Sequence, residues 1–112
     1  MLVWRHEDSE VKQVMIFVVT LTHPPELCLA NPPYREEAKK WMENASESAK
    51  KLGVKVHGSY VATNEHTFYF VLETDSFKAV SDFLSPPMLT HHTARVSPVI
   101  AAEEVLGLSF MK

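Results

Sequence analysis

The segment 11–22 constrains the fold of this chain more than any other, because it has the composition of a strand and is apolar on both faces. Val, Ile, Phe and Thr dominate it, as is typical of β-strands. One face carries Phe17, Val19 and Leu21, and the other carries Val14, Ile16 and Val18. Such a strand needs apolar cover on both sides of its sheet. The segment therefore predicts a central strand with packing partners on each face.

The remaining elements are a long helix, three strands and a short helix. Small and apolar residues recur at three- and four-residue steps along Tyr34–Leu52, with Trp41 and Met42 on the stripe expected to enter the core. Gly53 is expected to end this helix. The proline-rich segment 23–33 before it is expected to be a loop, since proline fixes φ and removes a backbone donor. The later elements are expected at Val54–Thr63, Thr67–Glu73 and Thr93–Ala101 as strands, with a short helix capped by Asp75 or Ser76.

This order of elements predicts an α+β fold, a ferredoxin-like βαββαβ sandwich with antiparallel sheet order 4-1-3-2 and both helices on one face. The other face would then be bare. Because the first strand is apolar on that side too, we expect a second copy of the chain to cover it. A length of 112 residues fits a single domain, 1–112, in which 1–10 and 102–112 are peripheral.

In element order, length and two-faced apolar strands, the segment 14–100 resembles the dimeric α/β-barrel superfamily. That group includes small cofactor-free monooxygenases, haem-degrading oxygenases and muconolactone isomerase-like proteins. The resemblance implies a homodimeric α/β barrel and, if the protein is an enzyme, an oxygenase-type or isomerase-type reaction. It supports the fold and the dimer more than any activity, because members of one fold differ widely in chemistry.

Composition narrows the partners and the compartment. The net charge is −3 and no stretch is dominated by Lys or Arg, so nucleic-acid binding is not expected. The longest apolar run, Val14–Val19, is too short to span a bilayer, and Arg5–Asp8 do not resemble a secretion signal. A single cysteine, Cys28, excludes a disulfide framework within the chain and suits a reducing compartment. We therefore expect a cytoplasmic protein without membrane association.

The predicted topology gathers histidines at one rim of the sheet. The end of the first strand, the turn between the second and third strands and the start of the fourth strand all lie on that rim. Its polar side chains are His23, Glu26, Cys28, Glu65, His66, His91 and His92. Because the first strand lies between the third and the fourth, we expect His23 to have His66 on one side and the His91–His92 pair on the other. This convergence of four of the six histidines is the strongest functional signal in the sequence.

Imidazoles beside a carboxylate or a thiolate are typical ligands of zinc and of non-haem iron. We therefore expect a site for one divalent metal, Zn or Fe, and no other cofactor. The candidate metal ligands are His23, Glu26, Cys28, His66, His91 and His92. Two alternatives stay open: a metal-free site in which His23 acts as the catalytic acid or base, and histidines that are merely solvated at strand ends.

A second candidate site lies in the barrel interior. Alternation along the strands groups the side chains of Thr20, Thr22, His57, Ser59, Tyr69, Glu73, Arg95 and Ser97. Of these, the candidate ligand-binding residues are Thr20, Tyr69, Glu73 and Arg95: Arg95 could hold an anion and Tyr69 could donate to an oxygen. Glu73 could pair with Arg95 instead, or the set could be satisfied across the dimer. A slip of one residue in register would turn the whole set to the other face.

Taken together, the sequence predicts a small-molecule-binding or oxygenase/isomerase-like protein with a His-rich, metal-competent site at the barrel rim. The expected partners are a second copy of the chain and a small molecule. Whether the protein is an enzyme stays open. The alternative is a non-catalytic dimeric module that binds an effector or serves assembly.

Overall fold

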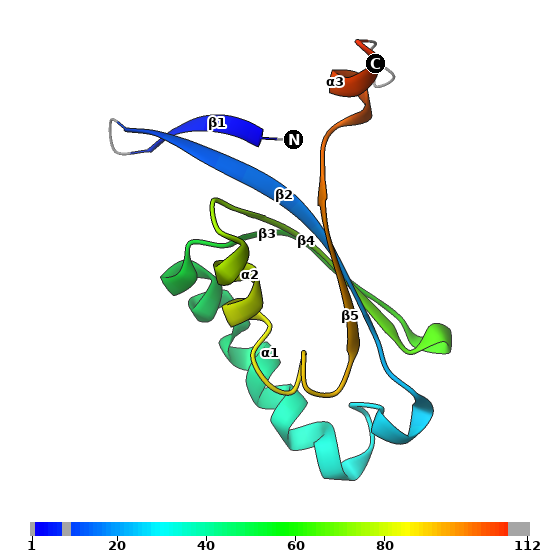
Figure 1. Cartoon of the computed structure of the whole chain (residues 1–112). Helices are drawn as coiled ribbons and strands as arrows, with labels where there is room; N and C mark the ends of the chain where they lie inside the picture. Colours follow the sequence, from blue (N-terminus) through cyan, green and yellow to red (C-terminus); the bar gives the residue numbers. More distant parts are fainter. Residues whose placement is uncertain (1, 8–9, 108–112) are drawn as a thin grey trace.

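The computed structural model describes residues 2–7 and 10–107, with side chains from residue 14 onward (Figure 1). The strands are β1 (Leu2–Glu7), β2 (Glu10–Thr22), β3 (Lys55–Ala62), β4 (Thr67–Thr74) and β5 (Thr93–Val99). The helices are α1 (Pro32–Leu52), α2 (Phe77–Phe83) and α3 (Ala102–Leu106), with short 3₁₀ turns η1 (Pro25–Leu27) and η2 (Thr63–Glu65). The predicted positions of the four strands β2 to β5 and of the two longer helices are thus confirmed to within a few residues at each end, whereas β1 was not predicted.

β2 is the central strand, as its two apolar faces predict. It pairs antiparallel with β4 along one edge and with β5 and β1 along the other. β3 pairs antiparallel with β4, so the order β3-β4-β2-β5 is the predicted ferredoxin-like order. The α+β class and its antiparallel sheet are therefore confirmed, whereas the dimeric barrel stays a prediction. Of the segments expected to be peripheral, Leu2–Glu7 form β1, which extends one edge of β2, and Ala102–Leu106 form α3.

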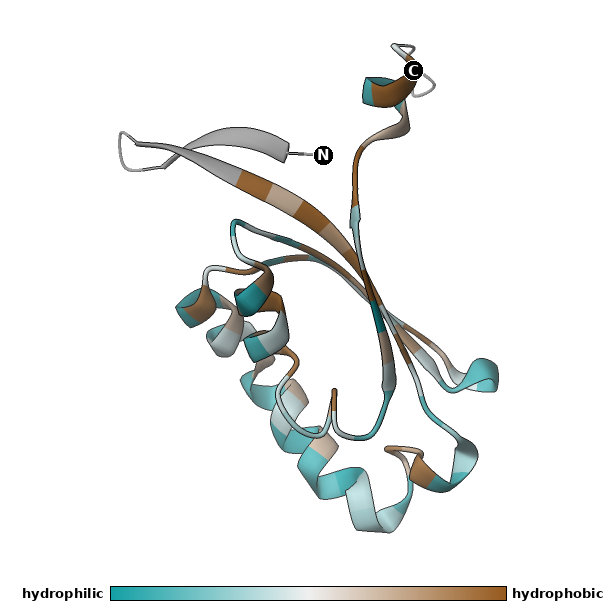
Figure 2. Ribbon diagram, viewed as in Figure 1, coloured by the Kyte–Doolittle hydropathy of each residue, from teal (hydrophilic) through white to brown (hydrophobic). Residues whose placement is uncertain are grey.

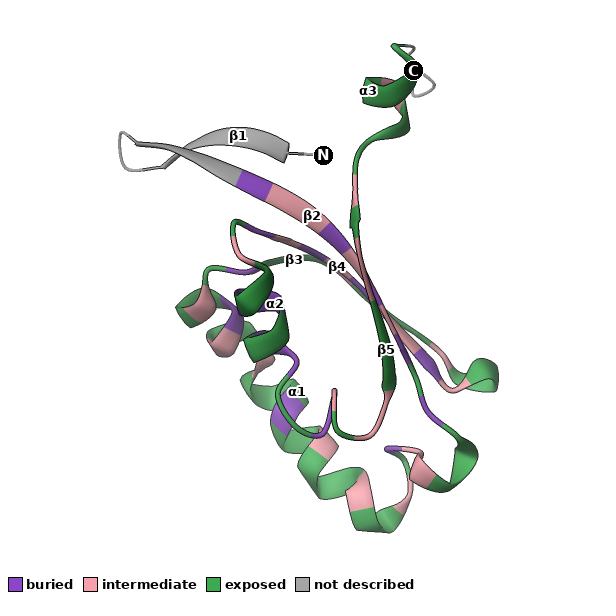
Figure 3. Cartoon of the chain, in the orientation of Figure 1, coloured by how far each residue is buried: buried purple, intermediate pink, exposed green. Residues whose placement is uncertain are grey.

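The core lies between one face of the sheet and the pair of helices α1 and α2, which both cover that face (Figure 1). Buried residues alternate with half-buried ones from Phe17 to Leu21 in β2, and α1 turns a largely hydrophilic surface outward (Figures 2 and 3). Trp41 joins the layers: its indole N–H donates to the carbonyl of Phe83 at 3.3 Å, and its ring lies edge-on to that of Phe70. Met42 was expected beside it in the core. That expectation is wrong. Met42 is one residue beyond Trp41, so its side chain points away from the buried side of α1 and is 54% exposed.

The ends of α1 follow local chemistry. The helix begins at Pro32 after the N-cap residue Asn31, so the two prolines occupy its first turn, where proline needs no backbone donor. It ends at Leu52, where Gly53 adopts φ 72° as the predicted stop. Ser76 caps α2, with its hydroxyl accepting from the backbone N–H of Ala79 at 3.1 Å. These ends fix where the connecting loops reach the rim of the sheet.

Candidate metal centre

His23 and His66 are held side by side by the sheet itself. His23 directly follows β2, and its backbone N–H donates to the carbonyl of His66 at 3.2 Å, which continues the β2–β4 ladder by one residue. His66 closes the turn between β3 and β4 with a left-handed backbone, φ 51°. The two rings meet edge to face, with centroids 5.2 Å apart. The predicted neighbourhood of His23 and His66 is therefore present.

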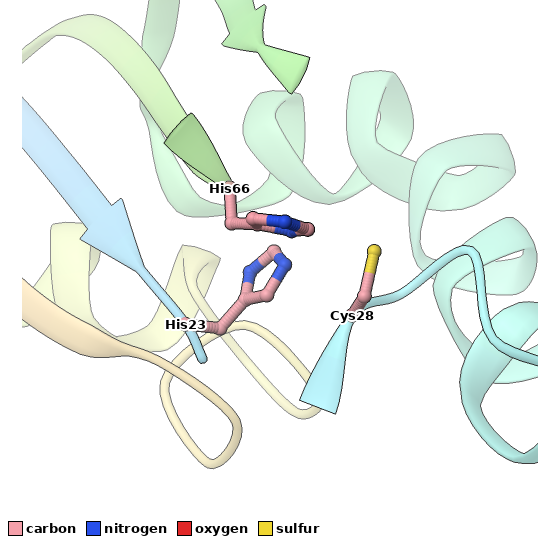
Figure 4. Close-up of side chains that lie close together, drawn as sticks. All are labelled: His23, Cys28 and His66. Carbon is pink, nitrogen blue, oxygen red and sulfur yellow. The ribbon is translucent and has the colours of Figure 1, made fainter. Parts of the chain in front are cut away.

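Cys28 reaches the same place through η1. The prolines of the loop start a 3₁₀ turn, and the Cys28 N–H donates to the carbonyl of Pro25 at 3.1 Å, so the chain doubles back towards the rim. Figure 4 shows the side chains of His23, Cys28 and His66 pointing toward one another. Their candidate ligand atoms all lie within 4.8 Å of one another. We refer to these three residues as the ligand triad.

The spacing of the ligand triad is close to that of a metal site. Donors on one tetrahedral zinc ion lie roughly 3.5 Å apart, given Zn–N and Zn–S distances of about 2.1 and 2.3 Å. Small rotations about side-chain bonds would therefore bring the three donor atoms to zinc distances. Among the described residues, this is the group of His, Cys, Asp or Glu side chains that could hold an ion.

The imidazole of His23 is buried without a partner. Its side chain is 5% exposed, and neither ring nitrogen has a hydrogen bond. Nearly all buried polar groups in proteins have at least one partner, so this ring is an exception that calls for a ligand. Burial lowers the pKa of His23, and the neighbouring His92 and His66 lower it further. The ring is therefore neutral near pH 7, the form in which histidine binds metals.

His92, immediately before β5, lies on the other side of His23. The ring centroids of His92 and His23 are 4.8 Å apart. The Nδ1 atom of His92 hydrogen-bonds the carbonyl oxygen of Met88; because a carbonyl only accepts, Nδ1 carries the proton. Its Nε2 atom therefore has a free lone pair, and that atom is buried without a partner. Burial is the main cause that lowers the pKa of His92.

The structure does not bring every predicted ligand into the cluster. His91 turns the other way from its neighbour: its ring packs edge-on against Tyr34 with centroids 4.9 Å apart, and its Nδ1 hydrogen-bonds the Thr90 hydroxyl. Glu26 lies exposed on η1 and is not part of the ligand triad. Of the six candidates, the structure therefore gathers His23, Cys28 and His66, with His92 adjacent.

A pocket of about 300 Å³ opens beside the ligand triad, and all three of its side chains line it. The other walls are Leu29, Ala30, Val61, Thr63 and Phe68. Sequence reasoning missed this mostly apolar wall. Part of this wall could have been predicted from the sequence. Val61 and Phe68 are paired across β3 and β4, and alternation along the strands places both on the helix-covered face, the face that also carries His23.

The second candidate site lies on the uncovered face of the sheet. The register pairs Thr20 with both Tyr69 and Arg95, and it pairs Ile16 with Glu73, so the four predicted ligand-binding residues share one face. Arg95 is exposed, and with Thr20, Thr22, Thr93 and Ala94 it lines a hollow of about 420 Å³. Their role in binding stays a prediction.

One member of the predicted set is on the wrong face. Ser59 pairs with Phe70, which faces the helices, because the register shifts by one residue between Val56 and Gly58. A β-bulge of this kind inserts one extra residue, here His57. The imidazole Nε2 of His57 then lies 2.9 Å from the Glu73 carboxylate. Glu73 therefore has His57 as a partner, whereas the sequence suggested Arg95.

Within the described residues, no helix combines the length and the apolar character needed to cross a lipid bilayer. A comparison with curated proteins finds no match to this chain. One family model, described as a domain of unknown function (DUF3303), matches residues 15–109, a span that contains the ligand triad and all the strands except β1 and the start of β2. Because this match covers most of the 112 residues, the chain belongs to the DUF3303 family.

Proposed function

We propose that this domain binds one zinc ion through His23, Cys28 and His66 and uses it to hold a small molecule in the adjacent pocket. The observation that carries the proposal is the buried imidazole of His23, whose two ring nitrogens both lack a hydrogen-bond partner. A buried polar group left unpaired costs about 1–3 kcal/mol. Coordination of an ion would satisfy one of these nitrogens directly.

The donor set supports zinc over the other metals considered. Thiolate and imidazole are ligands that zinc prefers, whereas magnesium and calcium take oxygen ligands. The two-histidine, one-carboxylate set that suits non-haem iron would need Glu26, which lies outside the ligand triad. Three protein ligands are also the number found in catalytic zinc sites, where the fourth position takes water or substrate.

Zinc has no redox chemistry, so this site favours Lewis-acid chemistry, such as isomerisation of a carbonyl compound, over an oxygenase reaction. In this proposal His23 is a metal ligand and not the general acid or base. Capture of an effector without turnover is the second candidate. It is favoured by the walls of the pocket, which beyond the ligand triad offer one polar side chain, Thr63, and no carboxylate.

We also propose that a second copy of the chain covers the open face of the sheet. Val18 and Val71 are paired on that face, and both are half-buried without contact from the helix layer. Tyr60 of the neighbouring β3 is 63% exposed. The order β3-β4-β2-β5, with both longer helices on the opposite side, supports face-to-face pairing of two sheets, which would bury these side chains.

Metal analysis of protein purified without an affinity tag tests the zinc site. We expect one zinc per chain, and replacement by cobalt should give a thiolate-to-cobalt charge-transfer band that reports on Cys28. The variants His23→Ala and Cys28→Ser should lose both signals. The matched control is His57→Ala, an exposed histidine near the other end of the sheet, which should keep them. Wild-type protein that takes up no metal, or equal loss in the His57 variant, would overturn the proposal.

A further inference from the structure

The walls of the pocket beside the ligand triad set the size and polarity of what can enter. Leu29 and Ala30 come from the loop after η1, Val61 from β3 and Phe68 from β4. The volume of about 300 Å³ lies at the small end of the roughly 300–1,000 Å³ typical of small-molecule sites. These walls therefore fit a compact apolar body and offer little to a polar one.

The charge of the proposed site determines the head group. A zinc ion with one thiolate and two neutral imidazoles keeps one net positive charge. The pocket lining contains no Asp, Glu, Lys or Arg side chain, so the protein leaves this charge unbalanced at the pocket. A charge in apolar surroundings is costly unless it is paired. A ligand with a single negative charge would pair with it.

Building on the proposed zinc site, we infer that the pocket binds a small monocarboxylate with an apolar body. Its carboxylate takes the fourth position on the metal, and its hydrocarbon part packs against Val61 and Phe68. A larger polar acid, such as a sugar acid or a nucleotide, would not find hydrogen-bond partners along these walls, since Thr63 is the one polar side chain beyond the ligand triad.

Three probes of matched structure test this inference on the cobalt-loaded protein. Hexanoate has both the charge and the apolar body, acetate has the charge alone, and hexanamide has the body alone. Each buried methylene strengthens binding roughly fourfold. We therefore expect hexanoate to shift the cobalt absorption bands at a concentration about tenfold or more below that needed for acetate or for hexanamide.

A pair of variants locates the binding in the pocket. Val61→Asn replaces an apolar wall residue that is 52% exposed, so the fold should tolerate it. Val105→Asn changes the same residue type at 62% exposure on α3, at the opposite end of the sheet from the ligand triad (Figure 1). Hexanoate binding should weaken several-fold in the first variant and stay unchanged in the second, with full cobalt uptake in both.

The outcomes separate this inference from the proposed function. Cobalt uptake is measured before any probe is added, and its absence would overturn the zinc site and the inference together. With normal cobalt uptake, equal affinity for hexanoate and hexanamide would overturn the carboxylate head group, and equal affinity for hexanoate and acetate would overturn the apolar body; either result leaves the zinc site standing. Equal effects of the Val61 and Val105 variants would likewise show that the apolar body does not occupy this pocket.

Discussion

The imidazole of His92 stands edge-on to that of His23, with an angle of 74° between the ring planes and both rings against Phe68. A histidine that binds a metal through one nitrogen usually donates its other N–H to a fixed acceptor, which orients the ring. In this structure no hydrogen bond joins the two rings, but the Nε2 lone pair of His92 would be such an acceptor for a metal-bound His23, since the Nδ1–H of His92 is already committed to Met88. Two imidazoles joined by an N–H···N bond have centroids roughly 5 Å apart. The observed separation is 4.8 Å, so rotation of the rings, without movement of the backbone, would form this bond when His23 binds a metal.

We therefore expect His92→Ala to weaken zinc binding by about 10–100-fold, the usual cost of losing such an orienting partner. Competition with a chelator of known affinity measures the change. His92→Gln, which keeps an acceptor near the position of Nε2, should recover part of the loss. His91→Ala, next along the chain but turned towards Tyr34, should bind zinc as the wild type does. Equal weakening in the His91 and His92 variants would contradict this role.

His23→Leu should abolish zinc binding and yet stabilise the metal-free protein. Leucine is similar in size and leaves no buried polar atom unpaired, so the expected gain in the free energy of unfolding is about 1 kcal/mol. Urea unfolding in the presence of a chelator measures it. A residue kept at the expense of stability is typical of a functional site. If the variant is less stable than the wild type, the imidazole has a structural role instead.

The metal-free protein should become less stable as the pH falls below the ordinary histidine pKa of 6.5. The pKa values of His23 and His92 are lowered in the folded chain, mainly by burial, so below that pH the unfolded chain binds more protons than the folded chain. The free energy of unfolding is therefore highest above pH 6.5, and it falls as the pH drops from 6.5 to the lowered pKa values of the two histidines. Urea midpoints at about pH 5 and about pH 7 should show this difference, and His23→Leu should reduce it. A flat profile would count against a buried neutral ring.

At micromolar concentration the wild-type chain should sediment as a homodimer. Val18→Asp places a charge in the middle of the open face and should give a monomer, because an unpaired charge cannot be buried between two sheets. Met42→Asp alters an equally apolar residue that is exposed on α1, and this variant should remain a dimer. Wild-type protein that sediments as a monomer would leave the open face without the proposed partner.

The strand order and the pairing of His23 with His66 could be predicted because they follow from periodicity and chain order. The two apolar faces of β2 predicted its central position, and alternation along the strands predicted that Thr20 shares a face with Tyr69 and Arg95, which the register bears out. Alternation holds only while the ladder is regular. The bulge at His57 therefore escaped prediction, although the neighbouring Gly58 is a residue that often marks one in a strand.

The direction of side chains in the loops was the other feature that could not be predicted from the sequence. Sequence reasoning grouped Glu26 with Cys28, because they are two residues apart. The 3₁₀ turn η1 leaves Glu26 exposed and places Cys28 beside the histidines. His91 and His92 were likewise treated as a pair, but each turns to a different neighbour. Local hydrogen bonds such as those to Pro25 and Met88 decide these directions, and no spacing rule contains them.

The left-handed backbone of His66 bears on how this turn can vary. Asn and Gly adopt that conformation most easily, and a histidine there costs on the order of 1 kcal/mol. Asn at this position would therefore give the β3–β4 turn a lower conformational free energy than His66 does. The substitution His66→Asn would relieve the backbone of the β3–β4 turn and remove one of the three proposed zinc ligands. This one substitution therefore separates the conformational preference of the turn from the requirement for metal binding.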